Sequence, residues 1–254
     1  LEFRRVLFRS SDAMAKSKVF VFESPDGRSA NAEMRSFILD RGLMGPGKKL
    51  RSLLSTESQE MFDKRIQEFG FIPSRFDGIN PWLASIILKV TFLEMLGYSA
   101  DAGADTKIEA YARDHDRGVR YLENARVGME ALATLGQTTG IQSVETTLAD
   151  MDEMPAILQD LIGRWQTGDI AGLSRMLNNS LKRYPDVGRL LLTDRNQAWS
   201  ERINRMATQH SAFFVTVGIA HLAGNGSLID QLCAKGLAVS RIDTPRPSDA
   251  CPST

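Results

Sequence analysis

The sequence predicts an α/β protein with a mixed sheet core that is built from N- and C-terminal segments and a large helical middle region. Three observations support this prediction. Short apolar, β-prone runs stand near both ends of the chain, at 18–24 and 213–217. The stretch 125–184 between them is rich in helical patterns. A chain of 254 residues that is 43% hydrophobic can form a core for one sizeable domain or two small ones.

Composition excludes several classes of function. Lys+Arg and Asp+Glu are equal at 31 each, and no basic stripe is visible, which argues against a nucleic-acid surface. No apolar run reaches the ~20 residues that a membrane helix needs, so we expect no transmembrane segment. The two cysteines, Cys233 and Cys251, cannot form a disulfide framework. A single bridge between them and a loose Cys251 in the tail both remain open.

The two ends of the chain differ from the rest. Residues 1–10, LEFRRVLFRS, are basic, fit nothing that follows, and resemble a translated sequencing-adaptor end. We interpret them as a non-native leader and expect the natural N-terminus to be missing. Residues 11–243 are predicted to form a single domain. The tail 244–254, rich in Pro and Ser, is predicted to be disordered.

The N-terminal half contains two predicted strands that each end in a carboxylate. KVFVFES, 18–24, has Glu23 at its C-terminal edge, and GVRYLE, 118–123, ends at Glu123. Between them, apolar spacing and start and stop signals predict three helices. These helices are predicted at 56–69, at 81–96 and at 106–116.

The C-terminal half is predicted to return to the sheet after a run of helices. Helical patterns cover 154–168, 169–184, 195–209 and 227–236. The runs FFVTV, 213–217, and LAVSRI, 237–242, flank the last of these helices and are predicted to be parallel strands of a βαβ unit.

One glycine-rich segment resembles a nucleotide-binding loop. GLMGPGKKL, 42–50, nearly matches G-x-x-x-x-G-K-[S/T], but Lys49 stands where a hydroxyl is required. No convincing strand leads into it, and the motif has meaning only in a strand–loop–helix context. We therefore interpret the segment as a surface loop.

His221, in GIAH at 218–221, is the first candidate for chemistry. Gly218 would let the backbone turn sharply as strand 213–217 ends, and His221 would face the crevice at the carboxyl ends of the strands, where ligands bind in α/β sheets. Imidazole is both a common metal ligand and a general acid–base. The alternative is a structural histidine that bonds a nearby carbonyl, and a single histidine favours that alternative.

Further candidates are charged or polar side chains near strand and helix ends. Arg195 and Asn196 open a helix after Asp194, a plausible N-cap, and Arg195 suits a carboxylate or an oxyanion. Glu23 and Glu123 stand at the edge of the core, where a carboxylate can ligate a metal or act as a base. The alternatives are a surface ion pair for Arg195 and a solvated strand end for the glutamates, and solvation is favoured for Glu123.

Seven segments in order resemble the TraB/PrgY/GumN family over most of residues 12–243. The two most specific are D-R-N-x-x-W, here Asp194 to Trp199, and V-G-x-x-H-L-x-G, here Val217 to Gly224. The other five are AMAKSKVFVFE, NPWLASIIL, Gly103-Ala104-Asp105, RYLE and Trp165 to Asp169.

The resemblance implies an EreA/ChaN-like fold and metal-dependent hydrolysis of peptides, as in the Tiki-type metalloproteases that resemble the family. It implies catalytic roles for Glu23, Arg195, Asn196 and His221. His221 and Glu23 would bind a divalent metal, either zinc, manganese or cobalt. The family's first G-x-x-H should precede Ala13, but adaptor-like residues stand there, so the resemblance implies an impaired site.

Two alternatives to an enzyme remain open. The same crevice could bind haem or another ligand without catalysis, as the ChaN resemblance allows. The protein could also be an accessory factor in polysaccharide or signalling-peptide biology. An exported or periplasmic location is common among bacterial relatives, and the resemblance implies it here as well.

Overall fold

The computed structural model describes residues 3–25, 31–183, 185–209 and 212–240. The chain divides into two compact units, and each is described by itself. The first consists of residues 1–24, 104–124 and 160–254, and the second of residues 25–103 and 125–159. Both are mostly helical, and the first contains a small parallel sheet. The α/β class is therefore confirmed.

The sheet of the first unit has three short strands in the order β2-β1-β3. The central strand is β1 (Val19–Phe22), with β2 (Gly118–Tyr121) on one side and β3 (Phe213–Val215) on the other. Both pairings are parallel, where the sequence predicted a mixed sheet. Because parallel strands share one direction, the residues that follow all three strands meet at one edge.

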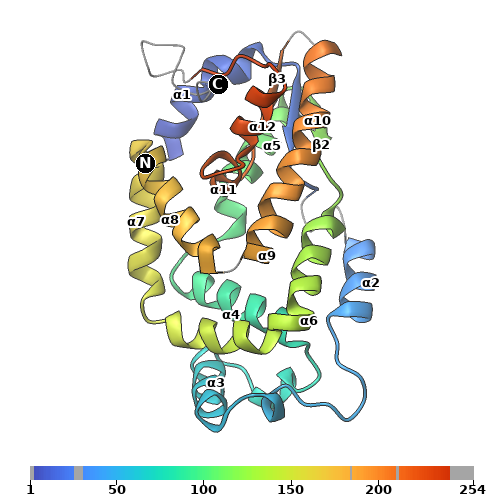
Figure 1. The fold of residues 1–254 in the computed structure, drawn as a ribbon, viewed down its shortest axis with the longest axis vertical. Helices are drawn as coiled ribbons and strands as arrows, with labels where there is room; N and C mark the ends of the chain where they lie inside the picture. Colours follow the sequence, from blue (N-terminus) through green and yellow to red (C-terminus); the bar gives the residue numbers. More distant parts are fainter. Residues whose placement is uncertain (1–2, 26–30, 184, 210–211, 241–254) are drawn as a thin grey trace. The chain divides into compact units, whose positions relative to one another are not determined.

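Apolar side chains cover both faces of this sheet. Successive residues of β1 point to opposite faces, so Phe20 and Phe22 join one cluster and Val21 joins another. The first cluster consists of Met14, Phe20, Phe22, Ile108 and Ala112. The second consists of Val21, Leu122, Trp199, Ile203 and Leu228. In Figure 1, α10 and α12 lie beside the strands of this unit, and they supply Trp199, Ile203 and Leu228 to the second cluster.

The helices of the first unit are α1 (Phe3–Lys16), α5 (Ala104–Asp114), α8 (Ile170–Arg183), α9 (Pro185–Gly188), a π-helical turn (Arg189–Thr193), α10 (Asp194–Gln209), α11 (Ile219–Leu222) and α12 (Leu228–Ala234). Helices α5, α8, α10 and α12 were predicted, whereas α1, α9 and α11 were not. Ser227 starts α12 with a capping box, because its side chain accepts from the backbone of Asp230 and the Asp230 side chain accepts in return.

Two predictions for this unit are wrong. The described residues 237–240 form no strand, because the backbone N–H of Leu237 donates to the carbonyl of Leu232 and closes the end of α12 instead of a ladder. Residues 241–242 lie outside the described part. Asp194 is not an N-cap, because the π-helical turn runs directly into α10 and the Asp194 N–H donates to the Arg189 carbonyl.

The second unit is a set of helices without a named strand among its described residues. Its helices are α2 (Asn31–Arg41), α3 (Thr56–Glu68), α4 (Pro81–Met95) and α6 (Ala125–Asp150), with short 3₁₀ turns at Arg51–Leu53, Pro73–Phe76 and Ala100–Ala102. Helix α7 (Met154–Thr167) crosses the boundary between the two units. The predicted helices at 56–69 and 81–96 are both confirmed, and Ser55 rather than Thr56 caps the first.

Helices α4 and α6 pack closely because α6 offers glycines at the contact. A Cβ on Gly136 would lie 2.1 Å from the Cβ of Trp82, and one on Gly140 would lie 3.1 Å from the Cβ of Pro81. The PW segment is therefore part of a helix crossing in the core of this unit. The glycine-rich segment 42–50 is a loop with residues 45–49 exposed, as predicted.

No helix within the described residues is long and apolar enough to cross a membrane. Cys251 and the tail 244–254 lie outside the described residues. The alternatives for the two cysteines and the disorder of the tail therefore stay predictions.

Candidate functional site

The carboxyl ends of the three strands bring charged and polar side chains together at one edge of the sheet. Glu23 follows β1, Glu123 follows β2, and His221 stands in α11 a few residues after β3. The backbone pairing continues just beyond the strands, since the N–H of Glu123 donates to the carbonyl of Glu23 at 2.8 Å. The two residues are therefore backbone neighbours, and Arg195 forms an ion pair with both carboxylates.

Arg195 of α10 lies at the centre of this group. Its Nε and Nη2 donate to the two oxygens of Glu123 at 3.1 and 2.8 Å, and Nη2 also donates to Glu23 Oε2 at 3.3 Å. Its Nη1 donates to the carbonyl of Leu191 at 2.9 Å and lies 3.4 Å from His221 Nε2. A guanidinium has five N–H donors, so these five contacts match the whole donor set.

Glu123 is buried and fully engaged. Its side chain is 6% exposed, and Oε2 accepts from the indole Nε1–H of Trp199 at 2.9 Å as well as from Arg195. A buried carboxylate needs such donors because burial removes its hydration. Glu123 therefore belongs to the structural core of the site, and the expectation of a solvated strand end is wrong for it.

Glu23 is the more accessible of the two carboxylates. Its side chain is 25% exposed, and its Oε1 accepts from the backbone N–H of Gly218 at 2.5 Å. Burial raises the pKa of Glu23 above its usual value, and the Gly218 N–H and Arg195 oppose that shift. The negative charges of Asp105 and Glu123 raise this pKa further.

His221 is held neutral in one tautomer. Its side chain is 5% exposed, Nδ1 lies 2.7 Å from Asn196 Oδ1, and Nε2 faces Arg195. Asn196 donates its Nδ2–H to the carbonyl of Gly226 at 3.0 Å, which turns Oδ1 toward the imidazole. Since the guanidinium can only donate, we assign the proton to Nδ1 and the lone pair to Nε2. Burial first, and then the charge of Arg195, lower the pKa of His221 to about 3.

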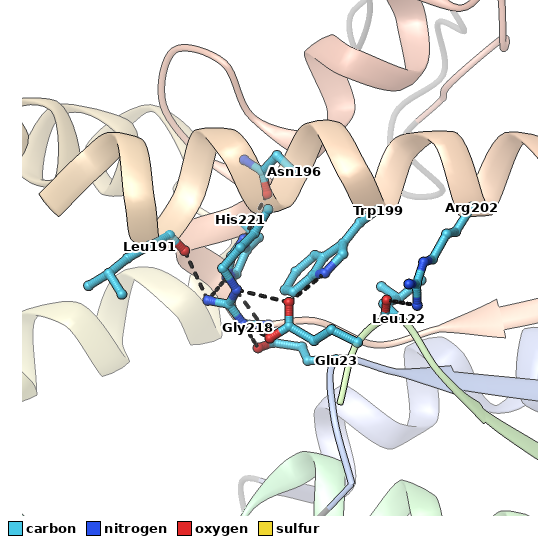
Figure 2. A network of polar contacts seen from close by, with 10 residues as sticks. Glu23, Leu122, Leu191, Asn196, Trp199, Arg202, Gly218 and His221 are labelled. Carbon is cyan, nitrogen blue, oxygen red and sulfur yellow. Dashed lines mark hydrogen bonds and ion pairs between the residues drawn. The ribbon is translucent and has the colours of Figure 1, made fainter. Parts of the chain in front are cut away.

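Trp199 contacts His221 through a tilted ring pair and Arg195 through a cation–π contact. The indole ring of Trp199 lies 4.3 Å from the His221 ring and 4.6 Å from the guanidinium carbon of Arg195. Figure 2 shows Asn196 and Trp199 projecting from one helix, α10, toward His221 and the strand ends. Such contacts restrict the rotation of the His221 and Arg195 side chains.

The local sequence explains why α10 can supply this many groups. Arg195 and Trp199 are four residues apart, so they share one face of the helix. The π-helical turn before α10 pairs the N–H of Asp194 with the carbonyl of Arg189, and the Leu191 carbonyl inside that turn accepts from the side chain of Arg195. Turns of this kind occur often at functional sites.

Comparison with known protein families matches residues 8–241 to the TraB/PrgY/gumN family. The chain belongs to this family. Among curated proteins, the protein YbaP of Escherichia coli (strain K12) and that of Shigella flexneri are each 26% identical over 183 residues, which cover 72% of this chain and 67% of theirs. No solved structure matches the chain, so the EreA/ChaN-like fold stays a prediction.

The TraB/PrgY/gumN resemblance read from the motifs is thus confirmed, and the structure brings Glu23, Arg195, Asn196 and His221 together. Their catalytic roles stay predictions. Sequence reasoning missed Trp199 as a member of the site, although its spacing from Arg195 could have indicated it.

Two further titratable residues lie in or just after α5. Asp105 is exposed inside the first turn of α5, and its Oδ1 accepts from Thr216 Oγ1 at 3.0 Å. It lies near enough to Glu23 to affect its pKa. His115 is exposed and lies against Tyr111.

The predicted metal ligands form a pair rather than a complete set. His221 Nε2 and Glu23 Oε1 are 3.9 Å apart. Among the residues that the structure describes, no group of three or more His, Cys, Asp or Glu side chains is arranged to hold a metal ion. Metal binding by Glu23 and His221 therefore stays a proposal.

Proposed function

We propose that this TraB/PrgY/gumN protein is a metal-dependent hydrolase of peptides, with its reacting groups at the carboxyl ends of β1 and β3. One observation carries the proposal. The carboxylate of Glu23 and the imidazole of His221, which are 198 positions apart in the chain, meet at 3.9 Å beside Arg195. Glu23 is accessible enough to meet a substrate, and His221 is fixed behind it.

The chemistry of the donors fits a divalent metal. A neutral imidazole with an unprotonated Nε2 and a carboxylate oxygen are the ligand types of catalytic zinc sites, which use bonds of about 2.0–2.2 Å. Two such bonds can span the 3.9 Å between His221 Nε2 and Glu23 Oε1. The hydrogen bond from Nδ1 to Asn196 is the outer contact that orients such a ligand.

The charge balance also favours a cation. Glu123 and Asp105 add negative charge near Glu23, Arg195 is the positive charge that opposes them there, and His221 is neutral. Two donors leave the other coordination positions to water or to groups outside the described residues. We therefore expect weak binding, in which the ion competes with the 3.4 Å contact between Arg195 Nη1 and His221 Nε2.

The hydrogen bonds support distinct roles for the four predicted residues. A bound metal would supply acidity to a water molecule at this position. Glu23 Oε1 would serve either as a metal ligand or as the general base that takes a proton from the attacking water and passes it to the leaving amine, because one oxygen cannot do both at once. Asn196 is buried and touches His221, so its role is to orient the imidazole rather than to meet the substrate.

Arg195 would act through its positive charge and through its hydrogen bonds to the two carboxylates. Its five donors are bonded within the protein, so a developing oxyanion would be stabilised by the nearby positive charge rather than by a new hydrogen bond. The resemblance implied a direct contact with the oxyanion or substrate, and these bonds favour an indirect one.

The test is cleavage of a mixed peptide library by excess protein, followed by mass spectrometry, with zinc, manganese or cobalt added. We expect metal-stimulated cleavage that falls at least about 100-fold in Glu23→Gln, because the general base is lost. Calorimetry with zinc should show weak binding that His221→Ala abolishes.

Matched variants separate the site from general damage. Glu201→Gln removes an exposed carboxylate of α10, and His115→Ala removes an exposed imidazole; both should keep cleavage and zinc binding. Absence of cleavage with all three metals would overturn the proposed activity. Zinc binding that survives His221→Ala unchanged would overturn the proposed metal ligands.

A further inference from the structure

Two carboxylates compete for one guanidinium at the edge of the sheet. The backbones of Glu23 and Glu123 are hydrogen-bonded just beyond β1 and β2, and Arg195 forms an ion pair with both carboxylates. The two carboxylates repel each other, and the negative charge of Glu123 raises the pKa of Glu23. The way in which Arg195 divides its donors therefore decides which carboxylate is neutralised and which keeps an oxygen for other partners.

The division is unequal. Glu123 receives the Nε/Nη2 edge of Arg195, with one bond to each carboxylate oxygen at 3.1 and 2.8 Å. This is the bidentate geometry that makes arginine–carboxylate pairs strong and directional. Glu23 receives a single, longer bond of 3.3 Å from the second hydrogen on Nη2, and that bond goes to Oε2.

Glu23 Oε1 is thereby left outside the ion pair. It accepts from the Gly218 N–H and faces His221 Nε2 at 3.9 Å. If Arg195 turned its Nε/Nη2 edge toward Glu23 instead, both oxygens of Glu23 would be bound in the pair. The geometry of the site thus depends on a competing carboxylate that holds the stronger edge of Arg195.

We propose that Glu123 is a positioning residue that holds Arg195 away from a two-point pair with Glu23. Its consequence for catalysis rests on the proposed hydrolase function, but the arrangement of Arg195 does not. Three features give Glu123 the advantage. It is more deeply buried than Glu23, it accepts a third bond from Trp199 Nε1, and its backbone is anchored beside Leu122, whose carbonyl accepts from Arg202.

The substitution Glu123→Gln removes the competition with almost no change of shape. An amide has one acceptor oxygen, while three donors from Arg195 and Trp199 converge at this position. We expect Arg195 to leave position 123 and to pair with Glu23 through two bonds. Catalysis should then fail because Glu23 is neutralised, although substrate can still bind.

The first measurement follows Arg195 directly and needs no activity. In ¹H–¹⁵N spectra, the Arg195 Nε–H, assigned by its loss in Arg195→Lys, should be protected from exchange in the unmodified protein. In Glu123→Gln this signal should shift, and the Trp199 indole signal should move because its acceptor is no longer charged. The other two indoles, from Trp82 and Trp165, should stay in place and serve as internal references.

The second measurement is peptide cleavage under the conditions used for the unmodified protein. We expect kcat of Glu123→Gln to fall about 10- to 100-fold with KM within about twofold, as for a misplaced group that acts only in the transition state. Arg195→Lys cannot form two parallel bonds and should lose a similar factor. The double variant should lose no more than the worse single variant, because both changes break one unit.

Glu109→Gln is the matched control. Glu109 lies at α5 beside β2, its side chain is largely buried, and it accepts from Tyr121 and Arg113. Its loss should lower the melting temperature and leave the Arg195 and Trp199 signals and kcat unchanged. Unchanged Arg195 and Trp199 signals in Glu123→Gln would overturn the positioning role, whatever the activity. A protein that cleaves no peptide would overturn the proposed function alone, because the spectra still decide where Arg195 lies.

Should Glu123→Gln fail to fold, Arg195→Lys provides the decision. Trp199→Phe removes the third donor to Glu123. If the losses of kcat in Arg195→Lys and Trp199→Phe were fully additive in the double variant, Glu123 would not couple the two residues, and the inference would be overturned.

Discussion

The carboxyl ends of β1 and β2 begin from the same pattern and reach opposite environments. Each is a short strand that leads into a glutamate, Glu23 or Glu123, and the two are backbone neighbours. Yet the Glu123 side chain is 6% exposed and takes three bonds from side chains, whereas Glu23 is 25% exposed and takes one from a side chain and one from a backbone N–H.

The difference shows that the role of a strand-end carboxylate depends on what packs against it. Helix α10 presents Arg195 and Trp199 one turn apart, and both donate to Glu123. Glu23 instead meets the segment after β3, where Gly218 offers a backbone N–H and His221 a lone pair. Glu123 thus completes the core, whereas Glu23 stays partly accessible at the edge of the sheet.

The largest change in the free energy of unfolding should follow removal of Arg195, the cation that Glu23 and Glu123 share. Arg195→Met leaves Glu123 buried without a counter-charge, and breaking a buried pair in this way costs about 3–5 kcal/mol. Denaturant unfolding should show that loss. Adding Glu123→Gln should recover a large part of it, while adding Glu23→Gln should recover little, since Glu23 keeps water and the Gly218 N–H.

Arg189→Met is the matched control for this experiment. Arg189 lies six residues earlier and pairs with Asp194 and Asp186 at the exposed surface. Surface pairs contribute about 0–1 kcal/mol, so its loss should be small. Equal recovery by Glu23→Gln and Glu123→Gln would contradict the distinction between the two strand ends.

The next effect should come from His221, which follows the third strand. Its pKa is lowered from 6.5 to about 3, so the unfolded chain binds a proton below pH 6.5 that the folded protein resists. The contribution of the neutral imidazole to stability is complete above pH 6.5 and is lost as the pH falls toward 3. At pH 5 the loss is roughly 2 kcal/mol, at about 1.4 kcal/mol for each pH unit.

Comparison of His221→Gln with the unmodified protein at pH 7.5 and pH 5 tests this linkage. Between pH 7.5 and pH 5, the free energy of unfolding of the unmodified protein should fall by about 2 kcal/mol more than that of the variant. His115→Gln, which changes an exposed histidine, should follow the unmodified protein. An equal loss in His221→Gln would show that His221 is not held neutral by burial.

Much of the fold could be predicted because local patterns dominate it. The apolar run at 18–24 and the spacing of apolar residues at 56–69 gave β1 and α3 within a residue or two. The strand predicted at 237–242 failed for a tertiary reason. Its alternating apolar residues suit a strand, but the chain closes α12 through Leu237 instead of adding to the sheet.

The site could be predicted at residues that belong to a family motif. It could not be predicted where the environment of a residue depends on a contact with a distant helix. Glu23, Arg195, Asn196 and His221 were candidates from their places near strand and helix ends, the TraB/PrgY/gumN resemblance selected them, and the structure brings them together. Glu123 was misjudged because a strand-end glutamate looks solvated until a helix from 72 positions later covers it. No local pattern contains that contact.

The smallest effect should come from Glu23→Gln and should have the opposite pH dependence to that of His221. The raised pKa of Glu23 means that the folded protein keeps a proton which the unfolded chain has lost. The contribution of Glu23 to stability is therefore complete below its usual pKa of 4.5 and is lost as the pH rises through the folded value. Glu23→Gln should be as stable as the unmodified protein at pH 7.5, or more stable by under about 1 kcal/mol, and should lose that advantage at pH 4. Thermal unfolding at the two pH values, with the exposed Glu201→Gln as control, measures the difference.

If Glu23→Gln were clearly less stable than the unmodified protein at pH 7.5, the ionised Glu23 would stabilise its strand end as Glu123 does. The contrast between the two strand ends would then be wrong.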